Sequence, residues 1–132
     1  MMKTILATSS ALVMLAGAAF AQEAAAPQMT MEDAYAAAQN QLGVLEYCQT
    51  AGGVTDEVID TQNRLLAMIP TPDDTAPALE AYQKGKEGTV ASMGQETTLA
   101  EVAGARSTTE EALCQQMAEL VSQAAAQVPA AN

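Results

Sequence analysis

Cys48 and Cys114 are the residues of this 132-residue chain whose chemistry is easiest to interpret, because they are its only cysteines. They form no CxxC motif, and the chain has no histidine that could join them in a metal site. A redox-active or metal-binding pair is therefore disfavoured. In an oxidising compartment, two such cysteines are expected to form one structural disulfide. Closing a loop of this length would stabilise the fold by about 4 kcal/mol.

Four pairs of adjacent acidic residues also have types that could do chemistry, because paired carboxylates divide acid and base roles or bind hard cations. Each pair falls at or just before the first turn of a predicted helix, where negative charge interacts favourably with the helix dipole. No pair has the alternating acidic positions and central glycine of a calcium loop. The sequence therefore predicts a structural role and no metal site. The pairs are Glu32-Asp33, Asp56-Glu57, Asp73-Asp74 and Glu110-Glu111.

The absence of histidine weighs against enzymatic activity, since it removes the usual base that activates a serine or cysteine nucleophile. Gly85 and Gly88 do not form a phosphate-binding loop, because no strand is predicted before them and their spacing does not match the P-loop pattern. We therefore expect a protein that is not an enzyme, with no catalytic residues and no cofactor.

Residues 1–21 have the features of a secretory signal peptide. Lys3 precedes an apolar run from Ile5 to Phe20, and Ala19 and Ala21 supply small residues before the expected cleavage point. The run is short for a membrane span, which needs about 20 apolar residues, and no second such run follows. We expect a soluble mature protein that is periplasmic or secreted.

The net charge of the chain is −11, and cleavage after Ala21 would make it −12 because Lys3 is lost with no acidic residue. Such a chain repels phosphates, so nucleic acid is not an expected partner. Residues 98–114 have a helix-turn-helix pattern, but Glu110-Glu111 would begin the recognition helix. Two packed structural helices are therefore favoured over a DNA-binding motif.

The hydrophobic pattern predicts a first helix that begins at Thr30, in a capping box with Asp33, and ends at Gly52-Gly53. A second helix should begin at Thr55 and end before Pro70. The buried stripe of the first is expected to be Met31, Tyr35, Ala38, Leu42, Leu45 and Cys48, and that of the second Val58, Ile59, Leu65, Leu66 and Ile69.

Residues 70–77 are predicted to be a loop, and Pro77 suits the first turn of a third helix. That helix should bury Leu79, Tyr82, Val90 and Met93. Gly85 and Gly88 either break it or give it a closely packed face, and the sequence leaves both alternatives open.

Thr98 and Glu101 predict another capping box and a short helix to about Ala105. The last helix opens at residues 108–111 and should bury Leu113, Met117, Leu120 and Ala124, with Cys114 one position off that stripe. Met31, Met68, Met93 and Met117 have the spacing of gap-filling core residues.

These elements predict an all-α fold, a small bundle of four to five helices closed by one disulfide. No strand-like alternation or hairpin signal is found. The expected organisation is a signal peptide at 1–21, a flexible segment at 22–29, a helical domain at 30–126 and a disordered tail at 127–132.

Three blocks, QLGVLEYC at 41–48, AYQKGKEGTVASMG at 81–94 and TTEEALCQQM at 108–117, resemble small exported bacterial proteins of the pore-forming, early secreted antigenic target family. The resemblance implies a non-enzymatic exported helical protein that acts on membranes or on an unidentified protein partner. An alternative resemblance, based on size, helicity, one disulfide and export, is to periplasmic acid chaperones. Without histidine, a pH response would come from Asp and Glu at about pH 4 to 4.5.

Overall fold

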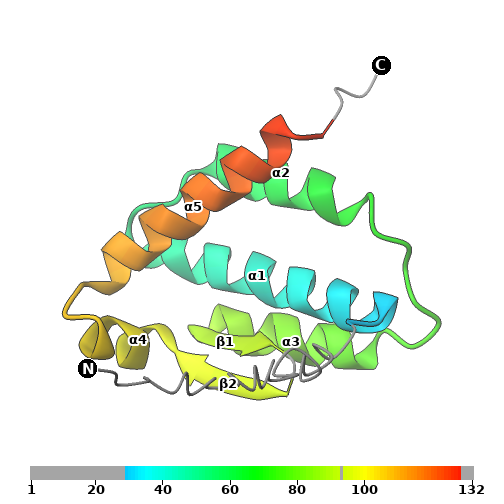
Figure 1. Ribbon diagram of the computed structural model, residues 1–132, viewed down its shortest axis with the longest axis horizontal. Helices are drawn as coiled ribbons and strands as arrows, with labels where there is room; N and C mark the ends of the chain where they lie inside the picture. Colours follow the sequence, from blue (N-terminus) through cyan, green and yellow to red (C-terminus); the bar gives the residue numbers. More distant parts are fainter. Residues whose placement is uncertain (1–28, 93, 129–132) are drawn as a thin grey trace, which may run out of the picture.

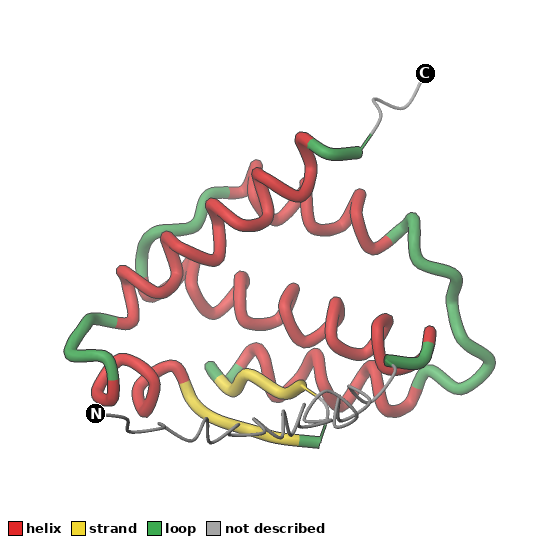
Figure 2. Tube along the Cα trace, in the orientation of Figure 1, coloured by secondary structure: helices red, strands yellow, loops and turns green. Residues whose placement is uncertain are grey.

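The structure is a computed structural model that describes residues 29–92 and 94–128. The predicted signal peptide at 1–21, all but Met29 of the 22–29 segment, Met93 and residues 129–132 of the predicted tail lie outside the described residues. The described part contains five helices and one two-stranded hairpin (Figures 1 and 2). Their bounds are α1 (Met31–Ala51), α2 (Asp56–Leu66), α3 (Ala76–Lys86), β1 (Thr89–Ser92), β2 (Gln95–Thr98), α4 (Leu99–Ala105) and α5 (Glu110–Ala126). The predicted all-α fold with one disulfide is confirmed, with the hairpin as a minor addition.

Helix α1 is the central element, with α3 on one side and α2 and α5 on the other (Figure 1). Its predicted capping box is present: the Thr30 side chain accepts a hydrogen bond from the Asp33 N–H at 3.1 Å. Gly52, with φ of 97°, ends the helix as predicted. Met31 was expected to begin the buried stripe, but it is 58% exposed, because the buried residues of α1 start only at Asn40.

Gly43 and Gly85 lie at the point where α1 and α3 cross. A Cβ atom on Gly85 would lie only 2.3 Å from the Asn40 carbonyl oxygen, so only glycine permits this approach. Helix α3 ends at Lys86, and Gly88 then takes a φ of 85°. The two glycines that the sequence left undecided therefore differ: Gly85 gives α3 a closely packed face, and Gly88 follows the end of the helix.

The hairpin contradicts the prediction that the chain has no strands. Strands β1 and β2 pair in antiparallel register, with Thr89 opposite Thr98 and Ser92 opposite Gln95. Strands of four residues are too short to show a clear alternation, and a long-range contact holds this pair. The amide of Asn40 on α1 donates to the Thr89 carbonyl oxygen at 2.9 Å and accepts from the Ala91 N–H at 2.9 Å. Val90 therefore belongs to the hairpin instead of a helix.

A cluster of buried hydrophobic side chains lies where α1, α4 and α5 meet. The predicted disulfide joins Cys48 to Cys114 there, with an S–S distance of 2.06 Å and a Cα–Cα distance of 5.5 Å. The cluster consists of Val44, Cys48, Leu99, Ala103, Leu113 and Cys114.

Several predicted core positions are wrong, and the disulfide explains those on α5. Because the bridge points Cys114 inward, the buried face of α5 includes Cys114 and Val121, and Leu120 is 61% exposed. On α2, Gln62 is buried and donates to the Ala38 carbonyl oxygen at 3.1 Å. Exposed instead of buried are Leu79, Met68, Met31, Leu120 and Ala124, whereas Val58, Ile59, Leu65 and Ile69 are only half-buried.

No helix within residues 29–92 and 94–128 is long and apolar enough to cross a membrane.

Candidate interaction surface

The acidic pairs occupy the structural positions that the sequence predicted. Three of the four pairs lie in the first turns of α1, α2 and α5. The fourth precedes α3, where the Asp74 carboxylate accepts a hydrogen bond from the Ala76 N–H at 3.0 Å. Within the described residues, no group of three or more His, Cys, Asp or Glu side chains is placed to hold a metal ion.

Two links join α1 to the start of α5. The first is the disulfide, whose cysteines are both 0% exposed. The second is a hydrogen bond from the Tyr47 hydroxyl to Glu110 Oε1 at 2.9 Å. This bond, together with burial and the negative charge of Glu110, raises the pKa of Tyr47 above its usual value. The two links hold the first turns of α5 firmly against α1.

Beyond these links, α5 diverges from α1. A row of residues at spacings of four and three runs along α1 from Cys48 through Val44 to Gln41, Ala37 and Ala34. Cys48 and Val44 are fully buried, but the last three are only half-buried. The far half of α5 lies toward α2 instead, as Figure 1 shows, and its Val121 is 1% exposed. The amino-terminal half of this row on α1 is therefore left partly uncovered.

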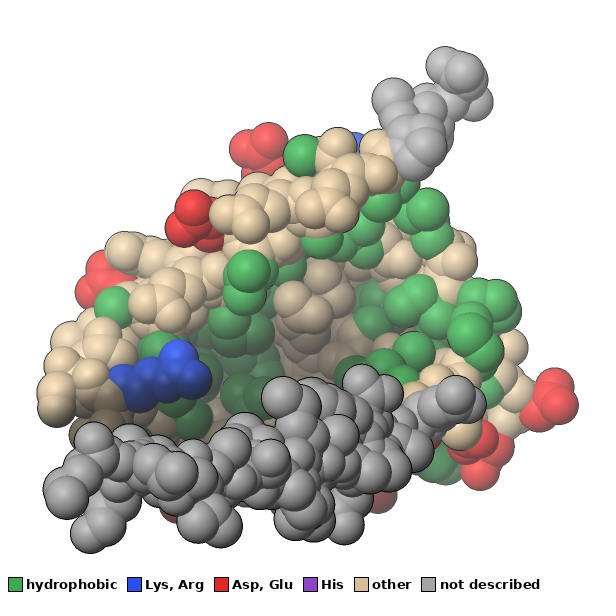
Figure 3. All heavy atoms as spheres, viewed as in Figure 1, with side chains coloured by type: hydrophobic (Ala, Val, Ile, Leu, Met, Phe, Trp, Pro, Cys, Tyr) green, Lys and Arg blue, Asp and Glu red, His purple; other side chains and the backbone are tan. Residues whose placement is uncertain are grey.

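Because Cys48 and Val44 of this row face α5, its spacing places the half-buried residues on the same side of α1, below the diverging part of α5. We call this region the α1–α5 hollow and assign to it Ala34, Ala37 and Gln41 of α1 and Met117 of α5. Met117 packs against the edge of the core cluster. Figure 3 shows this face hollowed below α5, with hydrophobic side chains gathered in and beside the depression. The acidic side chains visible in this view lie at the outer edges of the molecule. The hollow thus has the apolar concave shape that suits a binding site.

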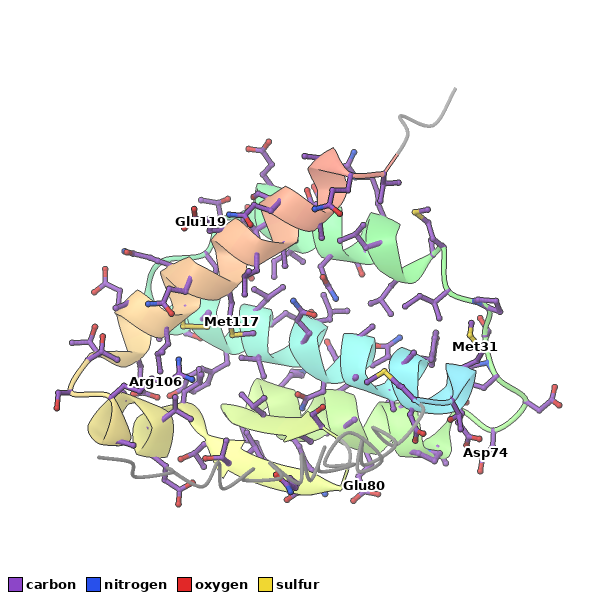
Figure 4. The ribbon with its side chains drawn as sticks, in the orientation of Figure 1. Met31, Asp74, Glu80, Arg106, Met117 and Glu119 are labelled. Atoms are coloured by element: carbon purple, nitrogen blue, oxygen red, sulfur yellow. A yellow bond between two sulfur atoms is a disulfide. The ribbon has the colours of Figure 1, made fainter. Side chains whose placement is uncertain are left out.

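Arg106 lies at the end of the hollow nearest α4. It is the C-cap residue of α4. Ala103, in the last turn of the same helix, belongs to the core cluster against which Met117 packs. Figure 4 shows Arg106 reaching toward the space below α5, and in Figure 3 a basic side chain borders the hollow. Both ion pairs found in the described residues are made by Lys84, so no described carboxylate pairs with Arg106.

The hydrophobic pattern alone does not reveal this surface, although the sequence contains one signal for it. The predicted stripe of α1 led from Cys48 through Leu45, Leu42 and Ala38, whereas the row described above leads from Cys48 through Val44. On that row the residues change from valine and cysteine to glutamine and alanine toward the start of the helix. Small and polar residues extending a buried row indicate a face that no other helix covers fully.

The fold and the disulfide define a small helical domain with one covalent link between its first and last helices. Comparison of the chain with family models, curated proteins and solved structures finds no match in any of the three.

Proposed function

We propose that this protein is a non-enzymatic, exported helical protein that acts by binding an apolar partner in the α1–α5 hollow. The observation that carries the proposal is the divergence of α5 from α1, which leaves Ala37 and Gln41 half-buried on the row of α1 that carries Val44 and Cys48. Methionine suits such a surface because its flexible thioether side chain adapts to different apolar shapes. The action on membranes or on a protein partner that the family resemblance implies would proceed through this face.

A membrane form requires a change in the position of α5. In its folded arrangement the mature chain would carry a net charge of −12, which repels anionic lipid surfaces at neutral pH. The disulfide and the Tyr47–Glu110 hydrogen bond also keep the buried face of α5 against α1. Pore formation would therefore follow reduction of the disulfide, or protonation of carboxylates near pH 4.

The hollow can be tested with Nile red, a neutral dye whose fluorescence rises in apolar surroundings. The oxidised protein at pH 7 should enhance the dye's fluorescence, and Ala37→Trp, which fills the hollow, should remove most of that enhancement. Ala100→Trp on the exposed surface of α4 is the matched control and should leave it unchanged. Enhancement that Ala37→Trp does not reduce would contradict the proposal.

The proposed action on membranes has a separate test, the release of dye from vesicles of phosphatidylglycerol and phosphatidylcholine. We expect little release at pH 7 with the disulfide intact, and release near pH 4 or after reduction. Efficient release at pH 7 by the oxidised protein would show that the hollow does not govern membrane action.

A second candidate function, an acid-activated chaperone, is favoured by two interhelical hydrogen bonds that depend on carboxylates. Tyr47 donates to Glu110 at 2.9 Å, and Tyr82 donates to Glu46 at 2.5 Å. Loss of the negative charge on these two carboxylates in acid would weaken both bonds and loosen α3 and α5 from α1. The test is whether the protein suppresses aggregation of an acid-denatured client; a flat result would remove this candidate.

A further inference from the structure

We infer that the ligand of the α1–α5 hollow is a monomeric long-chain carboxylate, with its apolar chain along α1 and its carboxylate at Arg106. The inference rests on the proposed function, because it names the ligand class of the same surface. It combines an apolar depression with a cation at one end.

Arg106 supplies the recognition of the anionic group. A guanidinium presents a planar fork of donors that matches the two oxygens of a carboxylate. Backbone hydrogen bonds fix the point from which this side chain extends: the Arg106 N–H donates to the Val102 carbonyl oxygen at 3.0 Å, and the Thr108 N–H donates to the Ala103 carbonyl oxygen at 2.9 Å. The Arg106 side chain is exposed at the end of α4, and no described carboxylate forms an ion pair with it.

The rest of the hollow fits an apolar chain. Starting from the Arg106 end, a ligand would pass Met117 and then follow the row of Gln41, Ala37 and Ala34 along α1. The alanines leave room beside the helix, and no acidic residue belongs to this row. Gln41 is the polar member of the row and carries no charge.

Charge also selects a single molecule over a lipid surface. A bilayer of anionic lipids presents many negative charges to a chain that has 16 acidic residues, and the repulsion acts over the whole face. A single carboxylate brings one negative charge, which Arg106 neutralises on contact. The structure therefore favours a free fatty acid over an anionic membrane.

The test is a titration of the oxidised protein at pH 7 with dodecanoate below its micelle concentration. Binding is measured by calorimetry and by the methyl NMR signal of Met117, assigned through Met117→Leu. We expect binding of one molecule that shifts the Met117 signal. Arg106→Gln should weaken it by about tenfold or more, as expected for loss of a charge-assisted hydrogen bond. Arg64→Gln, at an exposed arginine on α2, is the matched control and should not change it.

Two further ligands separate the outcomes. Dodecyltrimethylammonium has the same chain and the opposite charge, and it should bind at least about tenfold more weakly than dodecanoate. If both ligands shift Met117 equally and Arg106→Gln changes neither, the carboxylate inference is wrong while the apolar site stands. If neither ligand shifts Met117, the hollow is not a binding site and the proposed function fails with it. A shift with phosphatidylglycerol vesicles but not with dodecanoate would assign the face to a membrane.

Discussion

Gly43 and Gly85 face each other at the crossing of α1 and α3, so closely that neither position has room for a side chain. A Cβ atom on Gly43 would lie 2.2 Å from the Tyr82 carbonyl oxygen and 2.9 Å from the Lys86 nitrogen. Both contacts are with backbone, which cannot rotate away as a side chain can. The distance between α1 and α3, the two helices that pack most extensively against each other, therefore depends on this pair of glycines.

We predict that Gly85→Ala lowers the free energy of unfolding by about 3 kcal/mol, at the upper end of the cost of overpacking. Urea unfolding followed by circular dichroism would measure the change. Gly104→Ala is the matched control, since a Cβ there would meet nothing within 4 Å and the residue lies in α4. That variant should be more stable by about 0.5 to 1 kcal/mol. Equal stability of Gly85→Ala and the unchanged protein would show that the helices can separate at little cost.

Asn40 is the side chain that holds the hairpin to the helices. Its amide nitrogen donates to the carbonyl oxygens of Ala81 at 2.8 Å and Thr89 at 2.9 Å, and its oxygen accepts from Ala91. Asn40→Asp would replace the donor with a carboxylate oxygen facing two carbonyl oxygens. We predict a loss of about 3 kcal/mol or more at pH 7.

The same unfolding experiment checks this prediction, with Asn63→Asp as its control. Asn63 is exposed on α2, so that change should stay within about 0.5 kcal/mol. A tolerated Asn40→Asp would mean that the hairpin does not depend on the Asn40 amide.

The helices were predictable because their boundary signals are local. The capping boxes at Thr30 and Thr98 and the stop at Gly52 each act within a few residues, and all three are present in the structure. The hairpin was not predictable in this way, because it depends on Asn40, about 50 residues away in the sequence.

The candidate surface escaped prediction for a related reason. Which face of α5 is buried is determined by the direction of Cys114, and where α5 diverges from α1 depends on its packing against α2. Periodicity alone placed the stripe through Leu120, one position away from the buried Val121. An error of one residue rotates a helix by about 100°, enough to hide an open face.

Ser107 joins α4 to α5 in a conformation that favours glycine. Its φ is 51°, and its N–H and that of Thr108 close the end of α4 by donating to Gly104 at 3.3 Å and Ala103 at 2.9 Å. A residue with a Cβ costs about 1 to 2 kcal/mol in this region. We predict that Ser107→Gly raises the free energy of unfolding by about 1 kcal/mol. Ser107→Val should lower it, and the reverse order would contradict this assignment.

Tyr82 should make stability sensitive to alkaline pH. Its hydrogen bond to Glu46, with burial and the negative charge of Glu46, raises the pKa of Tyr82 from 10.0 to about 12. A raised pKa in the folded state contributes stability that is complete below pH 10 and is lost as the pH rises toward 12. Tyr82→Phe should lose stability at pH 8 and show a shallower decline from pH 10 to 12. Tyr35→Phe, whose hydroxyl accepts from Gln39, is the control and should keep the steep decline.

The disulfide allows the last prediction, because it connects stability with the shape of the hollow. Cys48 and Cys114 are 66 positions apart, fully buried, and form one of the two links between α1 and the start of α5. We predict that Cys48→Ala with Cys114→Ala lowers the free energy of unfolding by about 2 to 5 kcal/mol. The Tyr47–Glu110 hydrogen bond would then be the only one of the two links left, so α5 should move relative to α1. Dodecanoate binding should therefore weaken along with stability. Intact mass provides a check on the starting material: the oxidised chain is two hydrogens lighter than the reduced one, and native protein should not react with iodoacetamide. A double variant that unfolds earlier but binds dodecanoate with unchanged affinity would show that the hollow is formed without the disulfide.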